Sequence, residues 1–224
     1  MRLVPRSLPV LALVLGALSS SLAAQQSAPR DDNYRFWLGA QGGVTVFSTP
    51  GQSRGGIPTA GGSLLVKAKR TGVMLTLQEG FGSNEQTAYV SPSTGTTQTL
   101  VFNDLRTFAV HLMAFPIRSA AQPYFGVGFG LVNVVNPRPA NPTALTPQEV
   151  DLIREESDAI STDGFVSAVG GVNFNVGRIG AFGQYMYTSS ASRGKLLRGP
   201  THTLVAGVRF NLGSSRESLS TGGY

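Results

Sequence analysis

The stretch Pro123-Tyr124-Phe125-Gly126-Val127-Gly128-Phe129-Gly130 alternates large apolar residues with glycine. Successive side chains of a β-strand point to opposite faces, so the apolar residues share one face and the glycines share the other. Continued to residue 135, the pattern predicts a strand over 123–135. One face carries Phe125, Val127, Phe129 and Leu131, and the glycine face is one that other chain segments can approach closely.

Seven further segments show the same period of two, and each has an apolar face that is free of charged residues over most of its length. They are 34–47, 62–70, 72–82, 99–115, 164–176, 178–188 and 201–212. The opposite faces carry polar residues such as Lys67 and Arg209. A one-residue slip in register would turn these cations to the apolar side, and each basic residue at a bilayer midplane costs roughly 2–4 kcal/mol. We therefore predict that the uncharged faces look outward into lipid.

The links between these segments alternate in length. Short links at Thr71, 116–122 and Gly177 alternate with long ones at 48–61, 83–98, 136–163 and 189–200. Transmembrane barrels have short periplasmic turns and long extracellular loops, and hydrocarbon tolerates no unpaired sheet edge. The predicted fold is all-β, an eight-stranded antiparallel up-and-down transmembrane β-barrel over 34–212. Its interior should be filled by side chains, with Gly126, Gly128 and Gly130 making room for Trp37, Phe182 and Met186 across the lumen.

The N-terminus predicts export. Arg2 and Arg6 precede the apolar stretch Leu8–Leu18, and small residues end it at Ala23. This pattern is typical of a signal peptide over 1–23, too short for a membrane helix. Residues 24–33 and 213–224 are expected to be flexible segments on either side of the barrel.

Composition excludes several functions. The 224 residues contain 28 glycines and no cysteine, which excludes thiol catalysis and cysteine-bound metals. Removing Arg2 and Arg6 from the 18 basic residues leaves 16 against 12 acidic ones, a mild net charge of +4. No dense basic stripe suggests a nucleic-acid partner.

Three segments resemble the eight-stranded outer-membrane barrels of the OmpA and OmpX type. They are Pro123 to Gly130, Phe182-Gly183-Gln184-Tyr185-Met186-Tyr187 and His202-Thr203-Leu204-Val205-Ala206-Gly207-Val208-Arg209-Phe210. The resemblance implies location in the bacterial outer membrane, insertion by the barrel-assembly machinery and both chain ends in the periplasm. It identifies no activity.

Two groups of basic residues are candidate contact sites. Arg35, Lys67, Lys69 and Arg209 face inward near periplasmic strand ends. They form either an anion-attracting mouth or a rim of cations that are solvated or paired with Asp31 and Asp32. Arg54, Arg193, Lys195 and Arg198 fall in extracellular loops, where contact with lipopolysaccharide phosphates is plausible chemistry.

The third long link contains a helix signal. Thr146-Pro147-Gln148-Glu149 is a capping box with proline at the first helical position, which predicts a short amphipathic helix near 147–157. Its acids contrast with Lys195 and Arg198 in the next long link. Either the two loops attract one another, or they present a ligand surface.

No catalytic, cofactor or metal site is expected. His111 should be an interior hydrogen-bonding residue, and His202 has no serine or orienting acid at a catalytic spacing. Aromatic residues near strand ends are expected to form interfacial girdles, with Trp37 pointing inward. They are Phe36, Tyr124, Tyr185 and Tyr187.

The predicted function is a structural or surface-interaction role of a monomeric barrel: envelope integrity, adhesion or lipopolysaccharide contact. A narrow channel for small or hydrophobic molecules is the alternative, and a lipid A-modifying enzyme is a third hypothesis.

Overall fold

The computed structural model describes residues 34–52, 55–93, 95–189 and 195–215. The predicted signal peptide, residues 24–33 and residues 216–224 of the predicted tail lie outside these ranges. The strands are β1 (Tyr34–Ser48), β2 (Gly55–Lys67), β3 (Thr71–Val90), β4 (Thr97–Ala114), β5 (Ala121–Val135), β6 (Arg138–Pro139), β7 (Thr162–Val176), β8 (Ile179–Thr188) and β9 (Arg198–Ser215). A 3-10 helix, η1 (Pro142–Ala144), and the helix α2 (Pro147–Ile160) lie between β6 and β7. Neither helix in the described ranges is long and apolar enough to cross a membrane.

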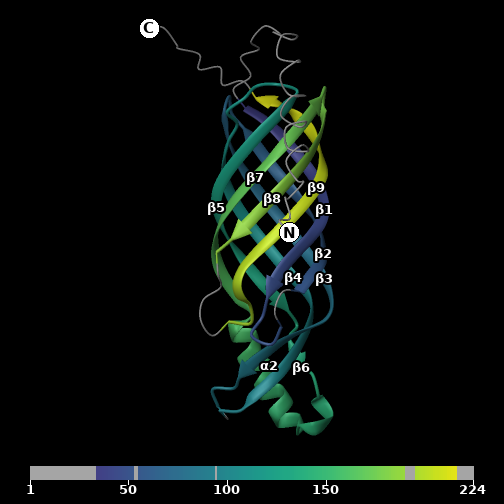
Figure 1. Ribbon diagram of the computed structural model, residues 1–224, viewed down its shortest axis with the longest axis vertical. Coiled ribbons are helices and arrows are strands. Elements are labelled where there is room, and N and C mark those ends of the chain that lie inside the picture. Colours follow the sequence, from purple (N-terminus) through teal and green to yellow (C-terminus); the bar gives the residue numbers. More distant parts are fainter. Residues whose placement is uncertain (1–33, 53–54, 94, 190–194, 216–224) are drawn as a thin grey trace, which may run out of the picture. The chain divides into compact units, whose positions relative to one another are not determined.

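The eight long strands close into an antiparallel barrel (Figure 1). The sheet runs in the order β3-β2-β1-β9-β8-β7-β5-β4, and β3 pairs with β4 to complete the ring. The first strand pairs with the last, from Tyr34 opposite Ser215 to Ser48 opposite Arg198. The predicted fold class is therefore confirmed, and the short strand β6 only extends the pairing of β4 beyond the ring.

The outward faces are the predicted ones. On β5, Phe125, Val127 and Phe129 are 59–66% exposed, as expected if lipid surrounds this wall. Trp37 and His111 on inward positions are buried. On β3 and β4, the uncharged part of the outward face extends no further towards the long links than Leu77 and Phe108.

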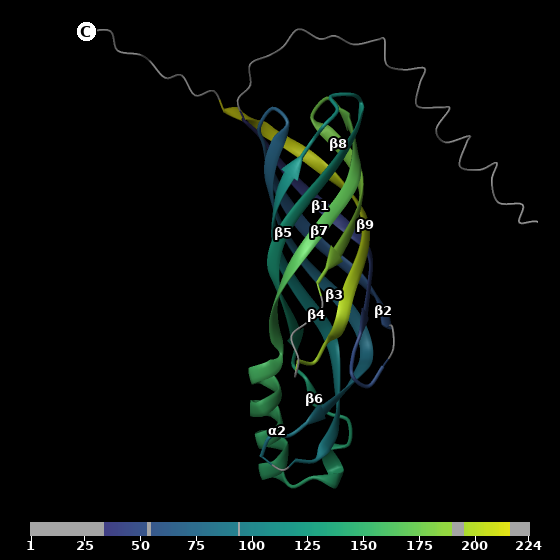
Figure 2. The same cartoon turned by 60° about the vertical axis from the view of Figure 1, so that its left-hand side comes forward.

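The barrel has two unlike ends (Figure 2). The short links 68–70, 115–120 and 177–178 lie at the end where Tyr34 pairs with Ser215, which we call the short-turn end. The long links lie at the other end, which we call the long-loop end. The predicted alternation of links is thus correct in its order.

Two of the long links, predicted at 48–61 and 83–98, are shorter than expected, because strands continue through them. β3 runs to Val90 and β4 begins at Thr97, so most of 83–98 is a paired hairpin that projects beyond the barrel. Three residues, 82–84, stand opposite Asn103 in a bulge, and Asn84 has a φ of 57°. A hairpin outside lipid does not need an apolar outer face. This explains why its sequence lacks the alternation of the barrel strands.

Two other boundaries were predicted wrongly. Residues 55–61 belong to β2 and pair with β1, whereas 68–70 form the turn that follows. Residues 213–215, expected in the flexible tail, extend β9 opposite the first residues of β1. Backbone pairing with β1 accounts for both differences, since a polar or glycine-rich stretch still pairs when its neighbour offers hydrogen bonds.

The inward glycines of β5 make room for adjacent strands and not for side chains across the lumen. A Cβ on Gly128 would lie 2.0 Å from the carbonyl oxygen of Val110 and 2.8 Å from the His111 ring. A Cβ on Gly130 would lie 2.6 Å from Phe165. The prediction that these glycines accommodate Trp37, Phe182 and Met186 is therefore wrong, because side chains on neighbouring strands lean over the glycine before the far wall is reached.

Candidate functional site at the long-loop end and in the lumen

The helix α2 begins where the capping box predicted. The Thr146 hydroxyl accepts a hydrogen bond from the Glu149 backbone N–H at 3.3 Å, and the Glu149 carboxylate accepts one from the Thr146 backbone N–H at 2.8 Å. The Thr146 backbone N–H and hydroxyl both donate to this carboxylate, and these two bonds lower the pKa of the Glu149 carboxyl. The helix runs to Ile160, three residues beyond the prediction.

One acid of α2 fastens the helix to the projecting hairpin. The Glu156 carboxylate accepts hydrogen bonds from the hydroxyls of Tyr89, Ser91 and Ser93 and from the Ser93 backbone N–H. The bonds from Ser93 and Tyr89 lower the pKa of the Glu156 carboxyl to about 2. Burial and the bond to Glu156 raise the pKa of Tyr89. A charged carboxylate that accepts several short bonds holds α2 against the hairpin of β3 and β4.

A hydrophobic core joins these elements at the long-loop end. We call it the loop-end core: Phe47, Ile57, Tyr89, Leu100, Phe102, Leu105, Val134, Ile153, Leu196 and Leu197. Its members come from the five strands β1 to β5, from α2 and from the link before β9. These side chains pack the long-loop end into a platform. Burial of their apolar surface stabilises it by roughly 25 cal/mol per Å².

The predicted attraction was between acids of α2 and basic residues of the next long link, but the contacts observed for Lys195 and Asp151 have other partners. Lys195 donates a hydrogen bond to the Thr162 carbonyl at 2.7 Å. The Asp151 carboxylate pairs within its own helix with Arg154, at 3.9 Å. The acids Glu156 and Asp151 of α2 are thus held by the β3–β4 hairpin and by the helix itself.

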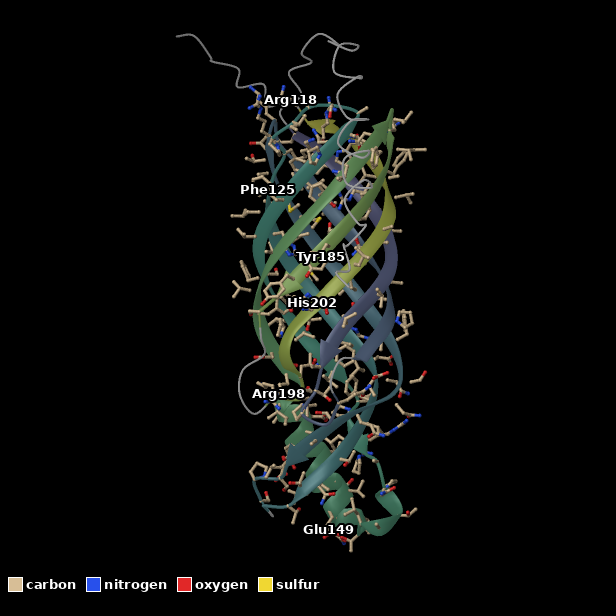
Figure 3. All side chains as sticks on the ribbon, viewed as in Figure 1. Arg118, Phe125, Glu149, Tyr185, Arg198 and His202 are labelled. Atoms are coloured by element: carbon tan, nitrogen blue, oxygen red, sulfur yellow. The ribbon has the colours of Figure 1, made fainter. Side chains whose placement is uncertain are left out.

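The four predicted lipopolysaccharide contacts fall in two groups. Arg54 and Arg193 lie outside the described residues. Arg198 lies at the start of β9 (Figure 3) and is exposed. Lys195, just before β9, is partly buried. These two cations stand at the edge of the apolar wall, at the long-loop end.

The edge of the wall also carries aromatic and paired charged residues. His202 shares a hydrogen bond of 2.6 Å between its Nδ1 and the Tyr185 hydroxyl, and its ring centroid lies 5.4 Å from that of Tyr187. Elsewhere on the barrel, Arg106 pairs with Glu79 at 2.8 Å. Such groups suit the headgroup region of a bilayer. Tyr124, expected in a girdle, instead points into the lumen and donates to Gln184 at 3.0 Å, because it alternates with the outward Phe125.

The four inward basic residues do not form one mouth. Arg35 and Lys69 are exposed at the short-turn end. Lys67 lies over the Phe115 ring at 4.2 Å and donates to Gln122. Arg209 is only 3% exposed, so the expectation that it lies at the periplasmic mouth is wrong.

Arg209 is buried because its long side chain extends inward from β9. Nη1 donates to the Asn173 side-chain oxygen at 2.8 Å, and Nη2 lies 3.5 Å from that of Gln184. The guanidinium carbon stands 3.8 Å from the Phe182 ring centroid. The alternation of side chains indicated its inward direction, but no sequence signal indicated its depth.

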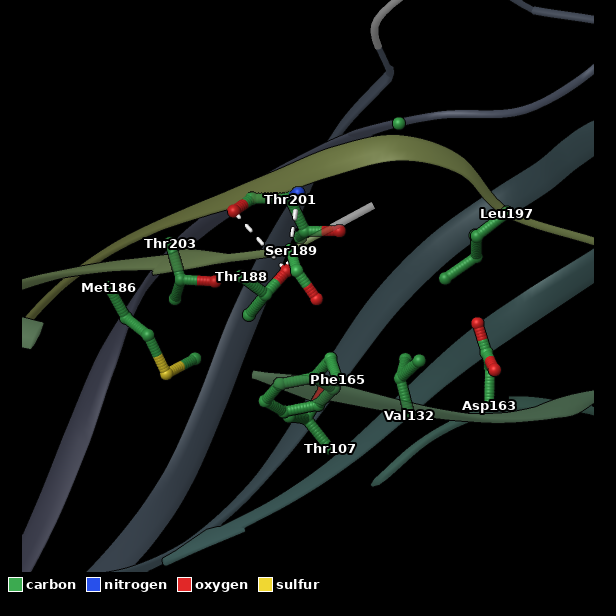
Figure 4. Close-up of a pocket in the computed structure, with 11 residues that line it drawn as sticks. Thr107, Val132, Asp163, Phe165, Met186, Thr188, Ser189, Leu197, Thr201 and Thr203 are labelled. Carbon is green, nitrogen blue, oxygen red and sulfur yellow. Dashed lines mark hydrogen bonds between the residues drawn. The ribbon is translucent and has the colours of Figure 1, made fainter. Parts of the chain in front are cut away.

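The lumen is closed by side chains. A second hydrophobic cluster, which we call the lumen cluster, fills the barrel towards the short-turn end: Trp37, Leu65, Met74, Met113, Phe115, Tyr124, Val169 and Met186. A pocket near β7, β8 and β9, lined by Met186 of this cluster and Leu197 of the loop-end core, has a volume of about 20 Å³ (Figure 4). Thr107, Phe165, Thr188 and Thr201 are among its lining residues. That volume holds about one water molecule.

The two histidines lie in different surroundings, one inside the barrel and one on its outer wall. The ring of His111 is hydrogen-bonded to the Ser167 hydroxyl at 2.9 Å inside the barrel, as predicted. His202 is bonded to a tyrosine on the outer wall. Within the described ranges, no three His, Cys, Asp or Glu side chains are grouped to hold a metal ion.

Eight closed antiparallel strands with an apolar exterior and a filled interior define a β-barrel of the outer-membrane type. Among solved structures, neisserial surface protein A (NspA) is similar, with a TM-score of 0.52 and 16% identity over 78% of this chain and 96% of that one. The outer membrane protein OprG from Pseudomonas aeruginosa has a TM-score of 0.41 and 14% identity, over 78% and 92% of the two chains. A major outer membrane protein from Thermus thermophilus has a TM-score of 0.43 and 13% identity, over 80% and 98%. No protein-family model and no curated protein matches the sequence.

Proposed function

We propose that the chain is an integral protein of the bacterial outer membrane with a structural or surface-interaction role, and that its long-loop end contacts lipopolysaccharide. The observation that carries this proposal is the packed platform at that end, with Lys195 and Arg198 at its base. The cations stand where the apolar wall gives way to polar residues. We expect this level of the barrel to face lipid headgroups, where the two cations could contact lipopolysaccharide phosphates.

Membrane residence is supported by the outer wall. Large apolar side chains are exposed on all the barrel strands except β2, among them Leu112, Phe129, Val166 and Leu204 at 59–66%. A water-soluble monomer rarely exposes so much contiguous apolar area. In a bilayer the same face is buried.

A surface role is favoured over conduction because the lumen is filled. The lumen cluster and the loop-end core lie at opposite ends of the interior. A narrow channel remains the alternative, and recording of single barrels in planar bilayers tests it: a steady conductance would contradict the surface role as the main one.

A lipid A-modifying enzyme has weaker support. His202 does face the wall, but its described hydrogen-bond partner is the Tyr185 hydroxyl. Mass spectrometry of lipid A from cells with and without the protein tests this hypothesis, and we expect identical masses.

The direct test of the proposal is lipopolysaccharide binding by the full mature chain in detergent. The double variant Lys195→Glu/Arg198→Glu should bind about tenfold more weakly, since exposed ion pairs contribute about 0–1 kcal/mol each. Arg118→Glu is the matched control, because Arg118 is exposed at the short-turn end (Figure 3). Dephosphorylated lipopolysaccharide should bind both proteins equally. Equal binding of intact lipopolysaccharide by wild type and double variant would refute the contact.

A further inference from the structure

Seven buried polar atoms inside the barrel have no hydrogen-bond partner among the described residues. They are Nε2 and Oε1 of Gln41, Oγ of Ser63, Oγ1 of Thr76, Nε2 of Gln78, Nδ1 of His111 and Nε of Arg209. The six side chains are each at most 6% exposed. A buried polar atom left unpaired destabilises a fold, so a group of seven indicates a place where something else supplies their missing hydrogen bonds.

These atoms lie between the two hydrophobic clusters. Along β1, Gln41 stands between Trp37 of the lumen cluster and Phe47 of the loop-end core. Along β2, Ser63 likewise stands between Leu65 and Ile57. The polar groups therefore form a layer that apolar side chains cover at both ends.

Strand pairing brings three of the groups together. Gly39 of β1 pairs with Ser63 of β2 and with Arg209 of β9, and Ser63 pairs with Thr76 of β3. A Cβ on Gly39 would lie 2.8 Å from both the Ser63 Oγ and the Arg209 Cγ. The glycine thus lets the arginine side chain and the serine hydroxyl approach one another over the same patch of backbone.

The layer is rich in donors and positive in charge. Nε of Arg209 and Nε2 of Gln41 and Gln78 are N–H donors, and the Ser63 and Thr76 hydroxyls can also donate. Among the buried residues of the described ranges, Arg209 carries the only full charge, and none is aspartate or glutamate. Amide oxygens and the Phe182 ring face parts of the guanidinium, but neither supplies a counter-charge. A buried charge without a counter-ion is costly.

We propose that this layer binds a small monovalent anion, held by the Arg209 Nε–H and the hydroxyls of Ser63 and Thr76. The anion neutralises Arg209 and accepts hydrogen bonds from the Arg209 Nε–H and the two hydroxyls, which otherwise lack a partner. The site is internal and independent of the proposed lipopolysaccharide contact, so either proposal can fail alone. Chloride is the natural probe because it accepts several hydrogen bonds in little space.

The first experiment compares unfolding of the full mature chain, in detergent micelles, in chloride and in gluconate at equal ionic strength. An anion that binds only the folded barrel raises the unfolding midpoint as its concentration rises. We expect that rise for the wild type in chloride, and its loss in Ser63→Ala/Thr76→Val. Lys67→Met is the control, because it removes a cation near the short-turn end and should keep the chloride dependence. Each single substitution provides a second measure if the double variant does not fold.

The second experiment is anomalous diffraction from crystals grown in bromide. A bromide peak within hydrogen-bond distance of the Arg209 Nε supports the site. Ordered water there without an anomalous peak would overturn the proposal. So would equal chloride dependence of the wild type and the double variant, or a bromide peak that persists in the double variant, which would mean binding at crystal concentration only.

Discussion

The Glu156 carboxylate of α2 and the Ser91 hydroxyl beyond the end of β3 are 2.8 Å apart, although 65 residues separate them in the sequence. Tyr89 and Ser93 donate to the same carboxylate. A single acidic side chain therefore connects the helix of the third long link to the projecting hairpin. The strength of this connection can be tested without disturbing the barrel.

We predict that Glu156→Gln loosens α2 but not the barrel. The amide keeps the size of the side chain, yet it loses the charge that strengthens the bonds from the hydroxyls. Hydrogen exchange of the α2 amides should become clearly faster, whereas the amides of β5 should keep their protection. Glu155→Gln is the control, since Glu155 is exposed on the same helix. Unchanged exchange in α2 would show that the loop-end core alone holds the helix.

The same connection should depend on pH in the acid range. The pKa of Glu156 is lowered from 4.5 to about 2 in the folded protein. The stabilisation that the charged carboxylate gives to the attachment of α2 is therefore complete above pH 4.5 and is lost as the pH falls towards 2. The carbon-13 chemical shift of the Glu156 carboxyl should therefore titrate near pH 2. A midpoint near 4.5 would contradict the hydrogen bonds from Ser93 and Tyr89.

The predicted fold followed from the lipid-facing side chains. A wall in contact with lipid must be apolar at every second residue of each strand. The alternation of Phe125, Val127 and Phe129 meets this requirement and is visible in the sequence. The start of α2 could also be predicted from the sequence, because the hydrogen bonds between Thr146 and Glu149 join residues only three apart. Local and periodic constraints are visible in one sequence.

The features that sequence reasoning missed depend on distant contacts. Nothing near Glu156 indicates that Tyr89 and Ser91 will bind it, and the projecting hairpin carries no lipid-facing period. The inward direction of Arg209 was readable, but its burial depends on Asn173 and Phe182 of other strands. The candidate site at the long-loop end was thus predicted as a set of charges and not as a packed platform.

We predict a strong dependence on depth for arginine on the outer wall. Val127 lies in the middle of β5 and Val176 at the short-turn end of β7, and both are exposed, at 64% and 82%. In a bilayer, Val127→Arg should lower the free energy of unfolding by roughly 2–4 kcal/mol and Val176→Arg by about 0–1 kcal/mol. Urea unfolding in lipid vesicles, followed by the fluorescence of the single tryptophan, measures both. Equal effects would contradict a bilayer centred on Val127.

Finally, close strand approach predicts opposite outcomes for two glycines. A Cβ at Gly128 would lie 2.0 Å from the Val110 carbonyl oxygen, whereas a Cβ at Gly183 meets no atom within 4 Å. Gly128→Ala must therefore push β4 and β5 apart, and overpacking of this kind costs about 1–3 kcal/mol. Gly183→Ala should be neutral or stabilise by up to about 1 kcal/mol, because it reduces the freedom of the unfolded chain. Urea unfolding, with gel migration before and after boiling to report closure of the barrel, separates the two variants. If Gly128→Ala were as stable as Gly183→Ala, β4 and β5 could not lie as close together as the pairing of His111 with Gly128 requires.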